Sequence, residues 1–240
     1  MARRFIDPEL KRLLGQKPLQ SLPVLGFFDN YPLQKWFRHG DFFLLCGTSD
    51  YSWAYLCGDN PEDLYEVLEK FAFQSLYFAN VEEWMLPVLT HKRKIEWKLS
   101  THRYYLPNGK TVDHPDYISK VLDKTMAKYI FERSAYKDFT SEEYIRERIE
   151  KDVSAGVWID GELVGWGLTH DDTSLGFLNV VPSYRSQGLG ESILRFLVIE
   201  KRQRKLPVFV NIEPHNHQSI NLVKKLGFSF DREVSWVKLT

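Results

Sequence analysis

In the first half of the chain, hydrophobic residues recur at the spacings typical of short strands and of amphipathic helices. Two aromatic-rich runs, 41–47 and 51–58, are separated by three polar residues and predict a β-hairpin. Asn60 followed by Pro61 predicts a helix start, because Asn caps helices and proline suits the first turn. The pattern also predicts strands at 73–79 and 94–106, with a helix that starts at Asn80 between them.

The second half carries a stronger pattern. Apolar residues at helical spacing predict a long helix that Pro115 opens and that continues to about residue 130. Thr140 with Glu143 predicts a capping box for a second helix. Further strands are predicted at 155–159, 162–169, 175–182, 208–212 and 228–239, and helices at 191–205 and 217–226. This succession indicates a mixed α/β fold, and no internal repeat is evident.

The composition excludes several classes of protein. The chain of 240 residues has 32 Lys+Arg and 32 Asp+Glu, and 43% of its residues are hydrophobic, which indicates a folded globular protein. Zero net charge argues against a dedicated nucleic-acid binder. No apolar run reaches the roughly 18 residues that span a bilayer, so no membrane partner is expected.

The cysteines, the N-terminal arginines and the charged helix residues are each expected to have a structural role rather than a catalytic or targeting one. Cys46 and Cys57 lie in apolar, strand-like stretches and are expected to be reduced, packed thiols. The N-terminal arginines resemble those of a transit peptide, but acidic residues follow at once. A cytoplasmic location is therefore expected, with a mitochondrial one as the alternative. The charges at 146–151 and 201–205, including Arg148 and Lys201, are expected to be solvated helix faces.

The segment 185–190, with the sequence RSQGLG, stands between a predicted strand and a predicted helix. Gly188 and Gly190 lack a Cβ, so several backbone N–H groups can converge on one point. The following helix adds unpaired N–H groups and the positive end of its dipole. No Gly-Lys-Ser/Thr follows, which excludes a Walker loop. The segment therefore predicts a cradle for a pyrophosphate.

Two ordered motifs carry a family resemblance. They are VVPSYRSQGLG at 180–190 and NHQSINLVKKLGF at 216–228, and with them the chain resembles the GNAT superfamily of acyl-CoA-dependent N-acyltransferases. Residues 28–32 and 59–62, with Trp166, resemble glycine N-acyltransferase-like proteins. The resemblance implies a GNAT fold in the C-terminal half, packed on a smaller or GNAT-like N-terminal α/β lobe. It implies domains at 1–125 and 126–240.

The resemblance also implies roles for single residues around acyl-CoA or acetyl-CoA. The backbone N–H of Leu178 would face the thioester carbonyl, and Val180 would pair its backbone with the pantetheine arm. Asn216 would hydrogen-bond the pantetheine, and Ser219 is small enough to allow its close approach. The residues that would hold the pyrophosphate are Arg185, Ser186, Gln187, Gly188, Leu189 and Gly190.

Two positions depart from the family pattern. Ser174 stands where many members have a catalytic Glu, and Val223 stands where many have a Tyr that protonates the leaving thiolate. The general base is therefore open between His170, Asp172, Glu213, a water relay and no dedicated base.

The resulting prediction is an N-acyltransferase that moves an acyl group from acyl-CoA to a small amine acceptor, such as glycine or another amino acid. The amine would attack the thioester directly. The alternatives are a protein or peptide N-acetyltransferase and a non-catalytic acyl-CoA-binding module. No metal is expected, because the His215-x-His217 pair lacks a supporting cluster of ligands. The protein is expected to be a monomer or a homodimer.

Overall fold

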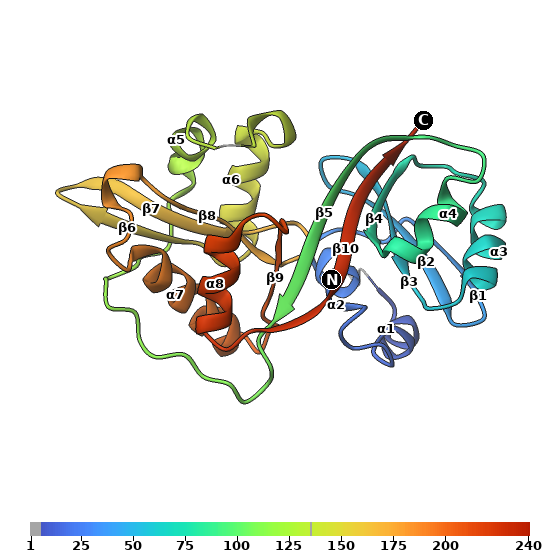
Figure 1. Ribbon diagram of the computed structural model, residues 1–240, viewed down its shortest axis with the longest axis horizontal. Coiled ribbons are helices and arrows are strands. Elements are labelled where there is room, and N and C mark those ends of the chain that lie inside the picture. Colours follow the sequence, from blue (N-terminus) through green and yellow to red (C-terminus); the bar gives the residue numbers. More distant parts are fainter. Residues whose placement is uncertain (1–5, 135) are drawn as a thin grey trace. The chain divides into compact units, whose positions relative to one another are not determined.

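The computed structural model describes residues 6–134 and 136–240, which divide into two compact units (Figure 1). The first unit comprises 6–104, 212–217 and 230–240, and the second comprises the other described residues. Among these residues no helix has the length and apolar character that a bilayer crossing requires. Whether 1–125 and 126–240 fold as separate domains stays a prediction.

The first unit is a mixed sheet with helices on both faces. Its strands lie in the order β1-β2-β3-β4-β10-β5, with β1, β2 and β3 antiparallel and β4 parallel to β3. Its helices are α1 (Pro8–Leu14), α2 (Leu22–Asn30), α3 (Pro61–Phe71) and α4 (Leu86–Leu89). Its strands are β1 (Lys35–His39), β2 (Phe42–Thr48), β3 (Ser52–Cys57), β4 (Tyr77–Val81), β5 (Ile95–Tyr105) and β10 (Ser229–Leu239).

Alternation along β2 explains the two layers of helix. Phe42 and Leu44 pack into the core that contains the apolar face of α3, whereas Phe43 and Leu45 pack into the core that contains α1 and α2. Successive side chains of a strand point to opposite faces, so a continuous apolar run serves both cores.

The second unit repeats this arrangement. Its strands lie in the order β9-β8-β7-β6, with β6, β7 and β8 antiparallel and β9 parallel to β8. Its helices are α5 (Ala127–Glu132), α6 (Glu142–Lys151), α7 (Leu189–Gln203) and α8 (His217–Lys225). Its strands are β6 (Ala155–Ile159), β7 (Glu162–Thr169), β8 (Leu175–Val180) and β9 (Phe209–Ile212).

Alternation along β7 brings α7 close to this sheet. Trp166 and Leu168 pack with α5 and α6, while Gly167 faces α7. A Cβ at Gly167 would lie 2.8 Å from the Leu197 side chain, so only glycine allows this separation. Each unit thus runs through two helices, three antiparallel strands, a helix and a parallel strand, a repeat of architecture without a sequence repeat.

Several predicted elements are confirmed. The hairpin at 41–47 and 51–58 is the pair β2–β3, in which Phe43 pairs with Cys57. Helix α3 begins as predicted, since Asn60 Oδ1 accepts a hydrogen bond from Asp63 N at 2.9 Å. The long strand at 94–106 is β5. Helix α6 is capped by Ser141, whose Oγ accepts from Tyr144 N, rather than by the predicted Thr140.

The long helix predicted from Pro115 is confirmed only near its end, where α5 begins at Ala127, and is wrong over its first part. Its backbone N–H groups have other acceptors: Asp116 N and Tyr117 N donate to Ser192 Oγ at 3.1 and 3.2 Å. Lys120 exchanges two backbone hydrogen bonds with Gly156 and so extends the sheet beyond β6. The helix at Asn80 is also wrong, because Asn80 lies inside β4 with φ of 60° and is buried.

Two charges that were expected on solvated faces are buried instead. Arg148 and Lys201 both have 0% relative exposure. Lys201 Nζ lies 2.8 Å from Asp152 Oδ2, and an Arg148 guanidinium nitrogen lies 3.6 Å from the same oxygen. Burial lowers the pKa of Lys201, an effect that Asp152 opposes. Helices α6 and α7 are thus joined by a buried ionic cluster of Arg148, Asp152 and Lys201.

Candidate functional site

The loop before α7 has the geometry of an anion cradle. Ser186 and Gly188 both adopt left-handed backbone conformations, with φ of 61° and 86°. Gly188 is the N-cap residue of α7, and no side chain among the described residues caps this helix. The first N–H groups of an α-helix have no partners within the helix, so an uncapped start leaves them available to a ligand.

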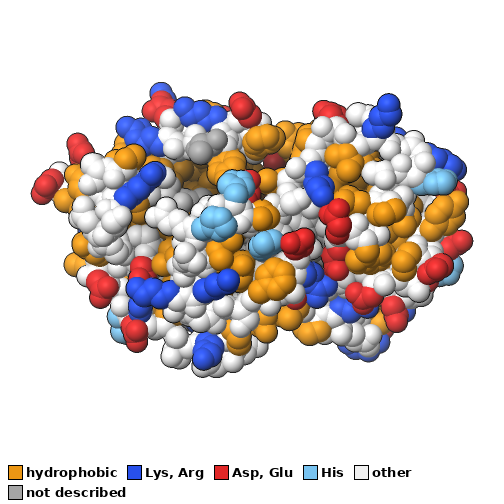
Figure 2. Space-filling model, in the orientation of Figure 1, with side chains coloured by type: hydrophobic (Ala, Val, Ile, Leu, Met, Phe, Trp, Pro, Cys, Tyr) orange, Lys and Arg blue, Asp and Glu red, His pale blue; other side chains and the backbone are white. Residues whose placement is uncertain are grey.

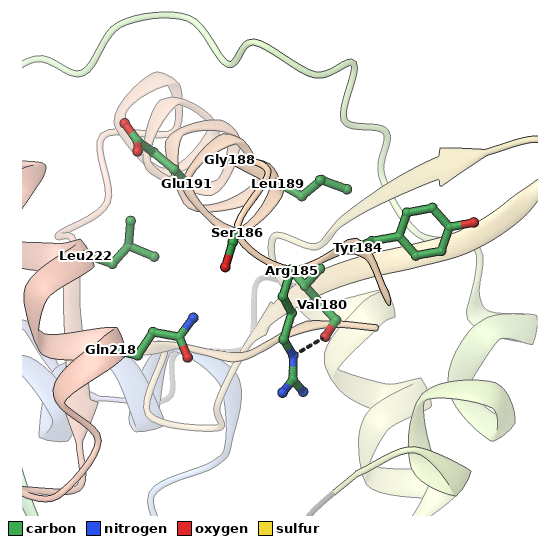
Figure 3. A pocket seen from close by; sticks show the side chains of 10 residues that line it. Val180, Tyr184, Arg185, Ser186, Gly188, Leu189, Glu191, Gln218 and Leu222 are labelled. Atoms are coloured by element: carbon green, nitrogen blue, oxygen red, sulfur yellow. Dashed lines mark hydrogen bonds between the residues drawn. The ribbon is translucent and has the colours of Figure 1, made fainter. Parts of the chain in front are cut away.

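A cavity of about 220 Å³ opens at this helix start (Figure 3). Helix α8 forms a second wall through Gln218 and Leu222, which Figure 3 shows opposite Ser186. The complete lining consists of Val180, Tyr184, Arg185, Ser186, Gly188, Leu189, Gly190, Glu191, Gln218 and Leu222. Six of the residues predicted to bind acyl-CoA are therefore brought together here, while Leu178, Gln187, Asn216 and Ser219 are not among the lining residues.

Four lining residues were missed by the sequence reading. Tyr184 lies inside the first GNAT-like motif, and Glu191 follows it directly. Gln218 and Leu222 lie four residues apart in the second motif, a spacing that puts them on one face of α8. The four-residue spacing of Gln218 and Leu222 was the sequence signal from which these two lining residues could have been predicted.

The charged side chains Arg185 and Glu191 of the cavity lining have hydrogen-bond partners within the second unit. Arg185 Nε donates to the backbone oxygen of Val180 at 2.9 Å. Glu191 accepts from Lys225 Nζ at 2.6 Å and from an Arg195 guanidinium nitrogen at 2.7 Å. These hydrogen bonds, the one from Lys225 first, lower the pKa of Glu191 below its ordinary value of 4.5. The carboxylate beside the cradle is thus neutralised by two cations.

Strand β8 is bulged next to this site. The pairing of β7 with β8 shifts between Trp166 and Leu168, and Phe177 has φ of 51°. An extra residue therefore lies in β8 opposite Gly167, and Leu178 is part of the bulge. The one β8–β9 pair in the described residues joins Leu175 and Val210, so the parallel ladder does not continue along β8.

The turn from His170 to Ser174 precedes β8. The Asp172 carboxylate is fully buried: Oδ1 accepts from Ser174 N and Oγ, at 2.9 and 2.6 Å, and Oδ2 accepts from Asn211 Nδ2 at 3.2 Å. The ring of half-buried His170 lies 4.6 Å from that of Phe177, centroid to centroid. Of these two candidate bases, His170 is the more accessible.

Three further candidates lie outside the cavity lining. Glu213 and Asn216 belong to the segment 212–217 of the first unit, where Asn216 N donates to Glu213 O at 2.9 Å. Glu213 also lies 3.7 Å from His215 Nε2. Ser219 lies on α8 of the second unit. Among the described residues, no group of three His, Cys, Asp or Glu side chains could hold a metal ion.

Comparisons with known proteins identify the fold. Residues 158–237 match a family model described as FR47-like protein. A solved protein from Drosophila has a TM-score of 0.79 and 18% identity, covering 99% of this chain and 98% of that chain. A GCN5-related N-acetyltransferase from Kribbella flavida has a TM-score of 0.61 and 14% identity, with 92% and 94% covered.

A GCN5-related N-acetyltransferase-like protein from Streptococcus suis has a TM-score of 0.58 and 12% identity, with 97% of each chain covered. None of the curated proteins matches the chain. The likeness to glycine N-acyltransferase-like proteins stays a prediction. These similarities extend over nearly the whole chain and show that it has the mixed α/β fold of the GNAT acetyltransferases.

Proposed function

We propose that the second unit binds acyl-CoA in the cavity beside α7 and transfers its acyl group to a small amine, such as glycine or another amino acid. The observation that carries this proposal is the uncapped start of α7, where Gly188 and Ser186 adopt left-handed backbone conformations and line a cavity. Such a start favours a pyrophosphate. Lysines, arginines and carboxylates are interspersed on the face seen in Figure 2, so local N–H groups rather than a broad basic surface would supply the affinity.

The reaction needs a positioned thioester and a proton acceptor. The amine nitrogen attacks the thioester carbonyl carbon, the C–S bond breaks, and CoA leaves as a thiolate that takes up a proton. In this proposal the backbone N–H of Leu178, at the bulge of β8, donates to the developing oxyanion. The attacking amine gives its proton to His170, either directly or through water. Accessible His170 suits this role better than Asp172, whose oxygens already accept three hydrogen bonds.

Calorimetric titration with acetyl-CoA and CoA tests the binding step. Gly188→Glu places a carboxylate at the anion cradle and should weaken CoA binding by about 100-fold or more. Gly161→Glu is the matched control, because Gly161 also has a positive φ, 84°, and nothing lies within 4 Å of its Cβ position. Unchanged CoA affinity in Gly188→Glu would show that the cavity is not the CoA site.

The acceptor is tested by thiol release from acetyl-CoA with glycine, other amino acids and peptides. Release with glycine or another amino acid supports the proposal, and release only with peptides supports a peptide N-acetyltransferase. His170→Gln should lower kcat and remove the limb of the pH profile near neutrality, with little change in CoA affinity. An unchanged pH profile would exclude His170 as the base.

A non-catalytic acyl-CoA-binding module is the second candidate. It is favoured by Ser174, whose Oγ is buried and donates to Asp172, and by Val223, which is 3% exposed and offers no proton. This candidate predicts CoA binding without thiol release for every acceptor tested.

A further inference from the structure

The face of α8 that lines the cavity continues past the cavity. Gln218 and Leu222 line it, and Lys225 follows on the same face at the end of the helix. The Lys225 Nζ lies 2.6 Å from Glu191 Oε2, and Glu191 itself lines the cavity. In Figure 3 the Glu191 carboxylate points to the side away from Arg185.

Of the two cations on Glu191, Lys225 is the one that solvent reaches. Its side chain is 66% exposed, whereas that of Arg195 is 14% exposed and also bonded to Asp113 at 3.0 Å. If Lys225 turned towards a ligand, Glu191 would keep Arg195 as its partner. Lys225 therefore combines a defined position beside the cradle with an ammonium group that is free to move towards an anion.

We propose that Lys225 recognises the 3′-phosphate of CoA, exchanging its ion pair with Glu191 for a contact with the phosphate while Arg195 remains the partner of Glu191. This inference rests on the proposed binding of CoA to the cavity. The 3′-phosphate is carried by the same ribose as the pyrophosphate, so it enters close to the cradle at Gly188–Gly190. A compact ammonium group binds a phosphate dianion strongly through charge-assisted hydrogen bonds. Lys225 would thus select CoA over dephospho-CoA, which has the same pyrophosphate but lacks this group.

The test compares the affinities of CoA and dephospho-CoA for each protein variant. The ratio isolates the 3′-phosphate, because every other contact is common to the two ligands. The unaltered protein should bind CoA roughly fivefold more tightly, as expected for one partly exposed ion pair, and added salt should reduce this preference. Lys225→Gln should bring the ratio close to one. Lys224→Gln is the matched control, since it removes the same charge from the adjacent exposed residue and should keep the ratio.

The Glu191→Gln variant distinguishes recognition of the 3′-phosphate by Lys225 from a purely structural role of the Lys225–Glu191 ion pair between α8 and α7. If Lys225 reads the phosphate, Glu191→Gln frees it from a competing carboxylate and should keep or raise the ratio, in contrast to Lys225→Gln. If the pair only braces the helices, both variants should leave the ratio unchanged or lower it together, which overturns the proposal. A ratio near one in the unaltered protein also overturns it while leaving CoA binding intact. Failure of both ligands to bind would reject the proposed function itself.

Discussion

The two units share a succession of elements, but their central helices begin in opposite ways. Helix α3 has Asn60 as a side-chain cap, Pro61 at its first position, and Glu62 and Asp63 in its first turn. Helix α7 begins at Gly188 without any side-chain cap. The first start has one N–H group bonded to the Asn60 side chain and presents two carboxylates, which repel anions. The second start also carries a carboxylate, Glu191, but Arg195 and Lys225 neutralise it, and its first N–H groups are left for a ligand.

The parallel strand pairs of the two units differ in a similar way, since one is followed by polar side chains of the protein and the other by a cavity. In the first unit β3 and β4 pair at three positions, and beyond them Asn80 Nδ2 donates to Leu56 O at 2.6 Å and to Gln20 O at 3.1 Å. Arg103, also buried, donates to Asn80 Oδ1. In the second unit the ladder is recorded only at Leu175, and Val180, further along β8, lines a cavity. Beyond the end of its parallel ladder, the first unit is thus filled by its own polar side chains, whereas the second unit has a cavity lined in part by Val180.

The largest expected effect on stability concerns the buried ionic cluster of Arg148, Asp152 and Lys201 in the second unit. Asp152→Ala would leave Arg148 and Lys201 buried without their shared carboxylate and should lower the free energy of unfolding by about 3–5 kcal/mol. Urea denaturation would measure this loss. Glu150→Ala on the same helix is the control, because its ion pair with Lys124 is exposed and should contribute far less to stability than the buried cluster. A similarly small loss for Asp152→Ala would mean that the buried cluster does not hold this unit together.

A smaller effect tests the first helix start directly. Asn60→Ala removes the cap of α3 and should lower the free energy of unfolding by about 1 kcal/mol, while CoA affinity stays unchanged. Asn60→Asp retains a capping oxygen and should restore most of the stability. Weaker CoA binding in Asn60→Ala, at a temperature where the protein is folded, would break the comparison by giving the first unit a part in the site.

The parts of the site that the sequence predicted are local. The cradle at 185–190 depends on adjacent residues, on Gly188 and on the helix that follows, and five of its six residues line the cavity, together with Val180. The cap at Asn60 was likewise predictable, because donor and acceptor lie three residues apart.

The wrong predictions depend on partners far along the chain. Lys201 is buried because Asp152 is folded against it. The first part of the helix predicted at 115–130 does not form, because its backbone N–H groups donate to Ser192 and Gly156 instead. Asn80 has good helix-start chemistry, but its amide satisfies Leu56 O and Gln20 O in the core. Periodicity and capping rules consider only neighbouring residues, so they cannot predict these contacts, which form only when the chain has folded.

The smallest expected effect concerns the reactivity of the two thiols of the first unit, which should be very low in the native protein. Burial raises the pKa of Cys57 to about 12 and that of Cys46 to about 11. At pH 8 only about one Cys57 in 10,000 would be a thiolate, the form that reacts with disulfide reagents. The native protein should therefore react very slowly at pH 8, and the urea-denatured protein should react with both thiols at once.

The raised pKa of Cys57 also gives a sign for the dependence of stability on pH. The thiol is protonated in the folded chain at pH values where the unfolded chain, with an ordinary pKa of 9.0, begins to lose its proton. Its contribution to stability is complete below about pH 9 and is lost as the pH rises towards 12. Cys57→Ala should flatten this decline. Rapid reaction of one thiol in the native protein at pH 8 would show instead that the core of the first unit opens locally, so that the contrast between a closed first unit and a second unit with a cavity would be one of degree.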